Sequence, residues 1–347
     1  MDISPVLDLL RQQIGLNPES IGTASVEKTV RERIEMSGAI NAGDYVRKIN
    51  SSAEELDRLV ESIVVRETSF FRNATPFITL QSYLKQFVLN KGRGRPLRIL
   101  CFPCSTGEEA YSIAMVLLDM ELPADQFFIF AGDISAQALQ IAEAGSYSSY
   151  SFRGKDIAFR KKYFTKQQDG SYILNKEVRD AVRFERGNIL SGNFLSGHQP
   201  YDVIFCRNVM IYFDDAAKAK AINSLLALLS GEGILFVGHA EVASIHQFGL
   251  MSLDYPMSFA FARKEYATSI NDALNIINPV KWNPAPQVPV QRKVIKQGLP
   301  SGSRKTIPVT PESGRNGENE RIARKNLVDG NISTARQSAA AGAFNEV

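Results

Sequence analysis

One short stretch, residues 96–111, constrains the fold of this chain more than any other. Its first part, Leu97 to Phe102, is an apolar run typical of a buried strand. A tight turn ending at Gly107 follows, and from Glu108 onward apolar residues recur at helical spacing. A strand, a glycine turn and a helix N-terminus in succession hold nucleotide-like ligands at the carboxyl ends of open α/β sheets. The stretch therefore predicts an α/β fold with a ligand site at this turn.

Two acids at the start of the predicted helix, Glu108 and Glu109, indicate the class of ligand. A helix N-terminus normally attracts phosphate groups, because its free backbone N–H groups point at the ligand. Two carboxylates there would repel a pyrophosphate and suit a ligand with a cationic or hydroxyl-bearing face. S-adenosylmethionine carries a sulfonium, an ammonium and a ribose, and it fits this description. A dinucleotide oxidoreductase, the alternative at such a turn, would need more glycines than the single Gly107.

Strand and helix patterns alternate between residues 75 and 262, which predicts a parallel sheet with right-handed crossovers. Strands are expected at 97–102, 127–133, 182–184, 201–206 and 233–237, with a final pair of segments ending at 258–262, and helices at 75–90, 108–120, 135–144 and 216–229. Residues 147–186 interrupt this rhythm. Within them Asp169-Gly170 stands between apolar residues, which is a hairpin signal, so we expect a small antiparallel insertion at the sheet's edge.

The chain on either side of this region differs in character. Residues 1–74 contain three apolar stripes at helical spacing, and Ser52 and Glu55 have the spacing of a capping box, so a helical N-terminal domain is expected. Residues 266–316 are rich in Pro, Gly and Lys and are interpreted as a linker. Residues 317–347 turn helical again and resemble the first helix pair of a tetratricopeptide array, which cannot bury its apolar face alone.

The net charge of +3 invites a nucleic-acid function, but the location of the charge argues against one. Residues 279–315 hold seven basic residues and one acid, and the rest of the chain has 33 basic against 36 acidic residues. A nucleic-acid enzyme would more often carry its basic residues on the folded part. The chain lacks a run of about 18 apolar residues, and its start, Met1-Asp-Ile-Ser-Pro, carries an acid where a signal peptide has basic residues. We therefore expect a cytoplasmic protein that does not insert into the membrane and does not bind nucleic acid.

The three cysteines point to a reducing compartment. Cys101 and Cys104 have the spacing of a redox pair, but the alternating pattern around them is not that of a thioredoxin-like domain, so we interpret them as small structural residues. A zinc site would need a second pair, and Cys206 is alone. The three histidines lack metal-ligand spacing, so no metal site is expected.

Polar residues follow several predicted strands, where sites of this sheet class are built. Asp133 ends one strand, where an acid accepts the two ribose hydroxyls of a nucleoside; the alternative is a helix N-cap, for which Ser135 competes. Asn188 follows another strand, and its amide can pair with an adenine edge. Arg207 and Asn208 end a third strand, and they are expected to bind a ligand or to form structural hydrogen bonds.

The junction after the N-terminal region places Phe70 and Phe71, which favour burial, beside the polar residues Thr68 and Arg72. A half-buried arginine at such a junction is usually structural. It is also how an enzyme sets a fixed cation against a carboxylate.

Five motifs stand out in chain order: Glu67-Thr-Ser-Phe-Phe-Arg72, Ser105-Thr-Gly-Glu-Glu-Ala-Tyr-Ser-Ile-Ala114, Gly132-Asp-Ile134, Phe205-Cys-Arg-Asn-Val-Met-Ile-Tyr-Phe213 and Gly238-His-Ala-Glu241. Together they closely resemble the CheR-type chemotaxis receptor methyltransferases, over about residues 1–265. The resemblance implies a Rossmann-like S-adenosylmethionine methyltransferase domain at 75–265, a helical N-terminal domain at 1–74 and a small antiparallel β-subdomain inserted near 147–186. It also implies conversion of glutamates in the cytoplasmic domain of a membrane chemoreceptor to γ-methyl esters, by a monomer, in chemosensory adaptation.

The resemblance also assigns roles to individual residues. Arg72 and Tyr212 fall on positions proposed to assist the transfer. The expected cofactor-binding residues are Thr68, Arg72, Glu109, Asp133, Asn188, Ile189, Cys206, Arg207 and Asn208. One departure is Arg66, where the family usually has Asn. A tetratricopeptide segment after the catalytic part resembles the variants that serve a surface-sensing receptor pathway.

Two alternatives stay open at this point. A non-catalytic receptor-binding scaffold on a methyltransferase fold is one, because Arg66 alters an expected cofactor contact. A methyltransferase acting on a small molecule or a nucleic acid is the other, and the substrate that accepts the methyl group would distinguish it.

Overall fold

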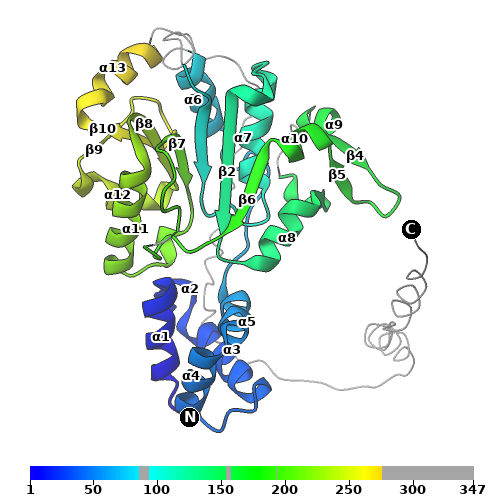
Figure 1. Ribbon diagram of the computed structural model, residues 1–347, viewed down its shortest axis with the longest axis vertical. Coiled ribbons are helices and arrows are strands. Elements are labelled where there is room, and N and C mark those ends of the chain that lie inside the picture. The colour runs from blue at the N-terminus through cyan, green and yellow to red at the C-terminus, as the bar shows by residue number, and fades with distance from the viewer. Residues whose placement is uncertain (86–93, 154–157, 193, 276–347) are drawn as a thin grey trace, which may run out of the picture. The chain divides into compact units, whose positions relative to one another are not determined.

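The computed structural model describes residues 1–85, 94–153, 158–192 and 194–275 (Figure 1). They belong to one compact unit, Met1–Pro289, and the second unit, Val290–Val347, lies outside the described residues. The expected tetratricopeptide-like segment at 317–347 and most of the expected linker therefore lie outside them as well, and both stay predictions.

A seven-stranded sheet forms the centre of this unit, in the order β6-β2-β1-β7-β8-β10-β9. The strands are β1 (Leu97–Cys101), β2 (Phe127–Asp133), β6 (Val182–Arg186), β7 (Tyr201–Cys206), β8 (Leu229–Val237), β9 (Leu250–Ser252) and β10 (Ala260–Arg263). The first five strands in this order are parallel, and β10 is antiparallel to β8 and β9. The strand order reverses between β1 and β7, and ligands of such sheets bind outside the carboxyl ends of the strands at that point.

Helices cover both faces of the sheet (Figure 1). Successive strand residues point to opposite faces, so Ile99 and Cys101 join one apolar cluster while Leu100 and Phe102 join the other. The first cluster includes residues of α6 (Thr75–Tyr83), α7 (Glu108–Asp119), α8 (Ala136–Ala144) and α13 (Lys264–Asn275). The second includes residues of α11 (Asp215–Leu228) and α12 (Val242–Ile245). The sequence prediction of an α/β sheet is confirmed.

Two expected boundaries differ from the structure. The linker was expected from residue 266, but α13 continues to Asn275 because Ala267, Ile270 and Leu274 recur at helical spacing and are buried against the sheet. The insertion was expected to reach residue 186, but β6 pairs with β2 and belongs to the main sheet.

The insertion itself forms the small antiparallel sheet that the sequence predicts. Its strands are β3 (Ser146–Tyr147), β5 (Tyr172–Leu174) and β4 (Phe164–Lys166), in that order, with α9 (Ala158–Tyr163) before β4 and α10 (Lys176–Asp180) after β5. Gly170 has a φ of +86°, as a tight hairpin turn requires. The ring of Phe70 stacks on Phe152 and meets Phe164 edge to face, which fixes the junction against the insertion.

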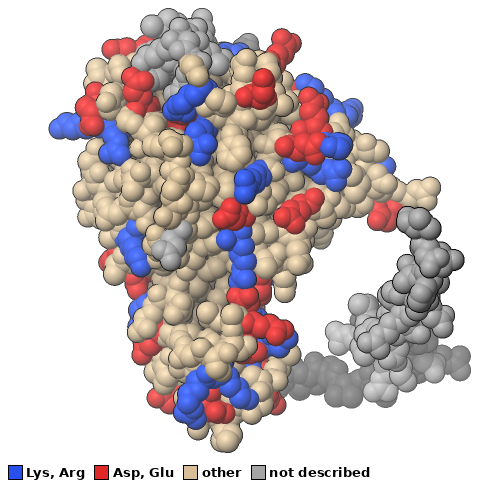
Figure 2. All heavy atoms as spheres, in the orientation of Figure 1, with Lys and Arg blue, Asp and Glu red and all other residues tan. Residues whose placement is uncertain are grey.

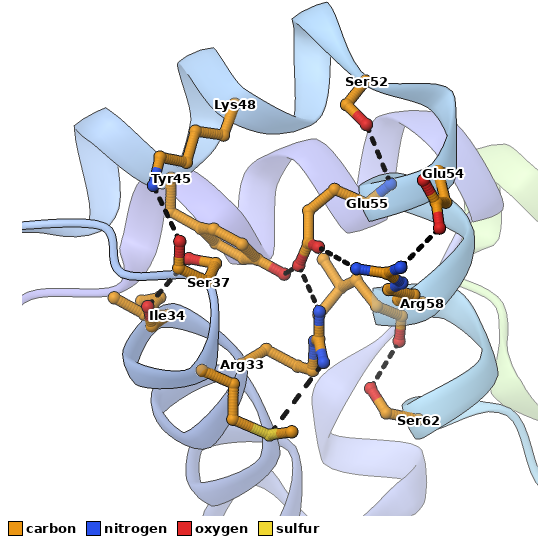
Figure 3. Close-up of polar contacts among 12 residues, drawn as sticks. Arg33, Ile34, Ser37, Tyr45, Lys48, Ser52, Glu54, Glu55, Arg58 and Ser62 are labelled. Carbon is orange, nitrogen blue, oxygen red and sulfur yellow. Dashed lines mark hydrogen bonds and ion pairs between the residues drawn. The ribbon is translucent and has the colours of Figure 1, made fainter.

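The N-terminal residues form five helices: α1 (Ser4–Ile14), α2 (Pro18–Ile21), α3 (Thr23–Met36), α4 (Ala42–Ser51) and α5 (Ala53–Ile63). The expected capping box is half formed, because Ser52 Oγ accepts from the Glu55 amide at 3.3 Å. The Glu55 carboxylate turns away and accepts from Tyr45 Oη at 2.8 Å and Arg33 Nη2 at 2.5 Å, as Figure 3 shows. This buried network ties α3, α4 and α5 together.

The helical N-terminal part contacts the sheet domain through a close backbone approach at Gly15. Leu16 and Phe213 form an isolated β-bridge, and the Asn17 amide donates to the Tyr212 carbonyl at 2.8 Å. Gly15 ends α1 with a φ of +68°, and a Cβ there would lie 2.5 Å from the Ala217 Cβ. Only glycine fits this contact without strain.

We expect Gly15→Ala to destabilise the protein by about 2–4 kcal/mol, because it adds overpacking to the cost of a left-handed conformation. Urea unfolding measures the effect. Gly38→Ala is a matched control, since Gly38 has the same φ of +68° but open space where the Cβ would be. Equal destabilisation by the two variants would show that the contact at Gly15 is not tight.

Candidate functional site

A pocket opens at the carboxyl edge of the sheet, at the end of β1, β2 and β7. Nine of the ten residues expected to bind the cofactor or assist the transfer line it. They are Thr68, Arg72, Glu109, Asp133, Asn188, Ile189, Arg207, Asn208 and Tyr212. These residues come from segments far apart in the chain, and the fold brings them to one place.

Cys206 is the residue that does not line the pocket. Its side chain is completely buried in the apolar cluster on one face of the sheet, and burial raises the pKa of its thiol. Cys101 and Cys104 are also buried free thiols with pKa values raised by burial, which agrees with a structural role for the pair.

Asp133 ends β2 with its carboxylate held by the main chain. Oδ2 accepts from the Ser105 amide at 2.7 Å, and Oδ1 accepts from the Ser135 amide at 2.9 Å. The N-cap of α8 is Ser135, whose Oγ accepts from the Ala138 amide at 3.0 Å, so Asp133 is not the cap. Each oxygen keeps a further lone pair for a ligand hydroxyl. Burial raises the pKa of Asp133 above its ordinary value.

The two glutamates at the start of α7 face different ways. Glu109 lines the pocket and forms a buried ion pair with Arg207. Glu108 lies outside that wall and accepts from Thr106 Oγ1 at 2.6 Å and Ser151 Oγ at 2.9 Å. The sequence predicts a pair of carboxylates facing the ligand, but of the two only Glu109 lines the pocket.

Arg207 lies at the carboxyl end of β7 and connects three parts of the site. Besides its pair with Glu109, its Nη2 donates to the Arg72 carbonyl at 3.1 Å. Among the described residues its buried Nε has no hydrogen-bond partner. A buried donor without an acceptor is costly, and a ligand with a carboxylate would relieve that cost.

The amide of Asn188 is already engaged within the protein. Nδ2 donates to the Gln13 carbonyl at 2.7 Å, and Oδ1 accepts from the Leu190 amide at 2.9 Å. Asn188 therefore links the end of α1 to the pocket wall, and its amide keeps a second N–H and a second lone pair for a ligand.

Arg72 and Tyr212 lie half-buried at the pocket wall. The pKa of Glu67 is lowered by its hydrogen bond from Arg153 and by the nearby charge of Arg72. Arg72 Nη1 donates to the Glu67 carbonyl at 2.9 Å. Burial raises the pKa of the Tyr212 phenol, so this group stays protonated and can donate a hydrogen bond at neutral pH. Together they offer two donors to an incoming carboxylate.

Glu241 is a residue whose role the sequence did not reveal. Its buried carboxylate accepts from the amides of Asn208 at 3.0 Å, Val209 at 2.8 Å and Met210 at 2.8 Å, and from the Gly238 amide. It holds the loop that leads from Arg207 to Tyr212 while Asn208 has a left-handed φ of +62°. The available signal was the acid in Gly238-His-Ala-Glu241, four residues after the end of β8 at Val237.

The sequence also did not predict the apolar part of the pocket wall. Ile14, Leu16, Ile21 and Ile63 reach it from the helical N-terminal part. In the sequence Ile14 and Ile63 belong to helical stripes, and Leu16 and Ile21 carry no signal of a site. Their position at the pocket depends on how the bundle contacts the sheet.

These residues fit S-adenosylmethionine. Asp133 offers acceptors for ribose hydroxyls, Glu109 a carboxylate for the ammonium, and Arg207 a cation with an unpaired donor for the carboxylate. The apolar wall suits the adenine ring. Among the described residues, groups of three His, Cys, Asp or Glu side chains arranged for a metal ion are absent.

Two further observations concern one face of the molecule and the helices of the described residues. On the face shown in Figure 2, basic and acidic side chains are interspersed over the described residues. The described residues contain no helix that is both long and apolar enough to span a membrane.

Comparisons with known proteins agree with this geometry. Residues 66–255 match the sequence model of the family described as "CheR methyltransferase, SAM binding domain". The chain is 40% identical over 259 residues to the probable biofilm formation methyltransferase WspC of Pseudomonas aeruginosa, which covers 75% of this chain and 61% of that protein. It is 34% identical over 346 residues to the protein of the same name from Pseudomonas putida, covering 97% and 79%. It is also 34% identical over 241 residues to chemotaxis protein methyltransferase 2 of Vibrio cholerae, covering 68% and 84%. The chain thus spans less than two thirds of the Pseudomonas aeruginosa relative.

Proposed function

The chain belongs to the CheR methyltransferase family, and we propose that it transfers a methyl group from S-adenosylmethionine to glutamate side chains of a chemoreceptor. The products are glutamate γ-methyl esters, and the process is chemosensory adaptation. The substrate glutamates lie in the cytoplasmic domain of a membrane receptor, and the enzyme acts as a cytoplasmic monomer. The names of the relatives support a role in chemotaxis-type signalling.

The observation that carries this proposal is the pairing of two kinds of group in one pocket. Glu109, Asp133 and Arg207 suit the charged and hydroxyl groups of the cofactor, while Arg72 and Tyr212 leave two donors free for a carboxylate. A scaffold without activity would not need these additional donors for a substrate carboxylate.

Methyl transfer to a carboxylate requires little from the protein beyond alignment of the reacting groups. A glutamate side chain has an ordinary pKa near 4.3, so at neutral pH it is already ionised and nucleophilic without a general base. When bound, S-adenosylmethionine supplies an electrophilic methyl group whose transfer to the carboxylate oxygen leaves a neutral thioether. Arg72 and the Tyr212 hydroxyl orient the carboxylate, and the apolar wall excludes water.

A labelled-methyl transfer assay with the full chain and cytoplasmic fragments of candidate receptors tests this function. We expect label that is released as methanol under alkaline conditions, as methyl esters require. Calorimetric titration with S-adenosylhomocysteine tests the scaffold alternative, because a dead fold without a cofactor site would not bind it. Label in a small molecule or a nucleic acid, with none in receptor fragments, would contradict the proposal.

Asp133→Asn is expected to weaken S-adenosylhomocysteine binding about 10-fold or more, because hydrogen bonds to a charged acceptor contribute about 1.5–3 kcal/mol. Wild-type affinity should also fall as the pH is lowered through the raised pKa of Asp133, since protonation removes an acceptor. The variant should lose that part of the pH dependence. Titration calorimetry at several pH values measures both, with exposed Asp125→Asn as the control.

A further inference from the structure

A second hollow adjoins the cofactor pocket. It shares residues 65–68 with the pocket and continues over Thr106, Glu108 and Ile141 to the insertion residues between 146 and 153. We call it the mouth groove. A polypeptide that delivers a side chain to Arg72 and Tyr212 can extend along it.

Exposed apolar side chains gather around the mouth groove. Tyr150 is 83% exposed, Val65 45% and Ile141 42%, and they belong to a small set of large apolar side chains that are exposed in the described chain. Singly such residues are ordinary, but a group around one hollow marks an interaction site.

The mouth groove is lined by two arginines, Arg66 and Arg153, and by two glutamates, Glu67 and Glu108. Arg66 is exposed, and its Nη1 donates to the neutral Gln137 Oε1 at 3.1 Å. The ion pairs found among the described residues do not include Arg66. A cation at a site entrance without a carboxylate partner is complementary to an acidic ligand.

Arg153 is the second cation, and its present partner is replaceable. It pairs with Glu67 at 2.8 Å, but the two side chains are 52% and 55% exposed. Such an exposed pair contributes only about 0–1 kcal/mol, so a carboxylate from a substrate can take the place of Glu67 at little cost.

Glu108, the acid beneath the mouth groove, does not prevent an acidic ligand from binding there. Glu108 is buried and already accepts hydrogen bonds from Thr106 and Ser151. Burial raises the pKa of Glu108.

Resting on the function proposed above, we propose that the mouth groove binds the receptor segment around the reacting glutamate, and that Arg66 binds a second carboxylate of that segment. The occupant is an acidic amphipathic segment: its apolar side chains contact Val65, Ile141 and Tyr150, while Arg72 holds the reacting carboxylate. Arg66 is thus a specificity-determining residue for substrates with neighbouring acids.

A double-mutant cycle on enzyme and substrate tests this inference. The probe is a cytoplasmic receptor fragment that the wild type labels, compared with a version whose acids within four residues of the methylated glutamate are changed to Gln. The enzymes are wild type, Arg66→Asn and the control Arg183→Asn, which changes an exposed arginine near the start of β6, at the other end of the strand from the site. Thermal unfolding verifies that the variants fold.

For the wild type, neutralising the neighbouring acids should lower kcat/KM about 10-fold, as the loss of one charge-assisted hydrogen bond predicts. On the parent fragment, R66N should have a kcat/KM lower than that of wild type by a similar factor. For R66N, neutralising the acids should lower kcat/KM by less than about a further 2-fold. R183N should behave as the wild type. If neutralising the acids lowers kcat/KM by the same factor for wild type and R66N, the inference is overturned and the proposed function is not. An enzyme that binds S-adenosylhomocysteine yet labels no receptor fragment would overturn the proposed function, and the inference with it.

Discussion

Replacing Arg72 with alanine is expected to lower kcat for methyl transfer by about 100-fold or more while the fold persists. The guanidinium lines the pocket together with Tyr212, and its Nη1 donates to the main-chain carbonyl of Glu67 rather than to a carboxylate. Without it, the substrate carboxylate loses a fixed cation and much of its orientation. The R72K variant keeps the charge but loses the planar fork, so an intermediate rate is expected.

The fold should survive because the neighbours of Arg72, rather than its side chain, fix the main chain. Phe71 and Asn73 have left-handed φ values of +52° and +55°, and the Phe71 amide donates to Ser112 Oγ at 2.9 Å. The bond from Arg207 ends on the Arg72 carbonyl, which alanine retains.

Labelled-methyl transfer gives kcat, and titration with S-adenosylhomocysteine separates the two roles assigned to Arg72. An affinity within about 10-fold of wild type, together with the lower kcat, indicates that Arg72 orients the substrate. An unchanged transfer rate in R72A would remove Arg72 from the mechanism. Thermal unfolding provides the control for the fold.

Glu241→Ala should both destabilise the protein and abolish most of its activity. The substitution leaves four backbone N–H groups without their acceptor. Each buried unpaired donor costs about 1–3 kcal/mol, and with partial hydration we expect a total of about 3–5 kcal/mol. For a domain of this size that lowers Tm by about 10 °C. Activity falls because the loop from Arg207 to Tyr212 loses its fixed position.

Glu241→Gln separates positioning from folding. Its single acceptor oxygen can keep part of the network, so we expect a smaller loss of Tm than in E241A but still a clear loss of kcat. The matched control is Glu185→Ala on the exposed side of β6, with an expected change within about 0.5 kcal/mol. A wild-type kcat in a folded E241Q would show that the loop does not depend on this carboxylate.

Local sequence patterns determined the framework of this protein. The bounds of β2 and β7 agree with the predicted 127–133 and 201–206, because a buried parallel strand is a continuous apolar run that reads the same in any context. The polar residues at strand ends were found for a related reason: parallel strands end at one edge of a sheet. Asp133 and Arg207 were therefore expected at one edge of the sheet, and the strand order, with only β1 between β2 and β7, brings them close.

Tertiary structure decided what each polar group does there. Asn188 bonds to a carbonyl 175 residues away, Glu241 bonds to amides more than thirty residues earlier, and Glu108 and Glu109 face opposite ways although adjacent. The apolar wall from the helical N-terminal part depends equally on a distant contact at Gly15. Apolar periodicity in the sequence predicts whether a residue is buried. The partner of a buried polar group comes from a segment remote in the chain, so it is determined only when the segments pack together.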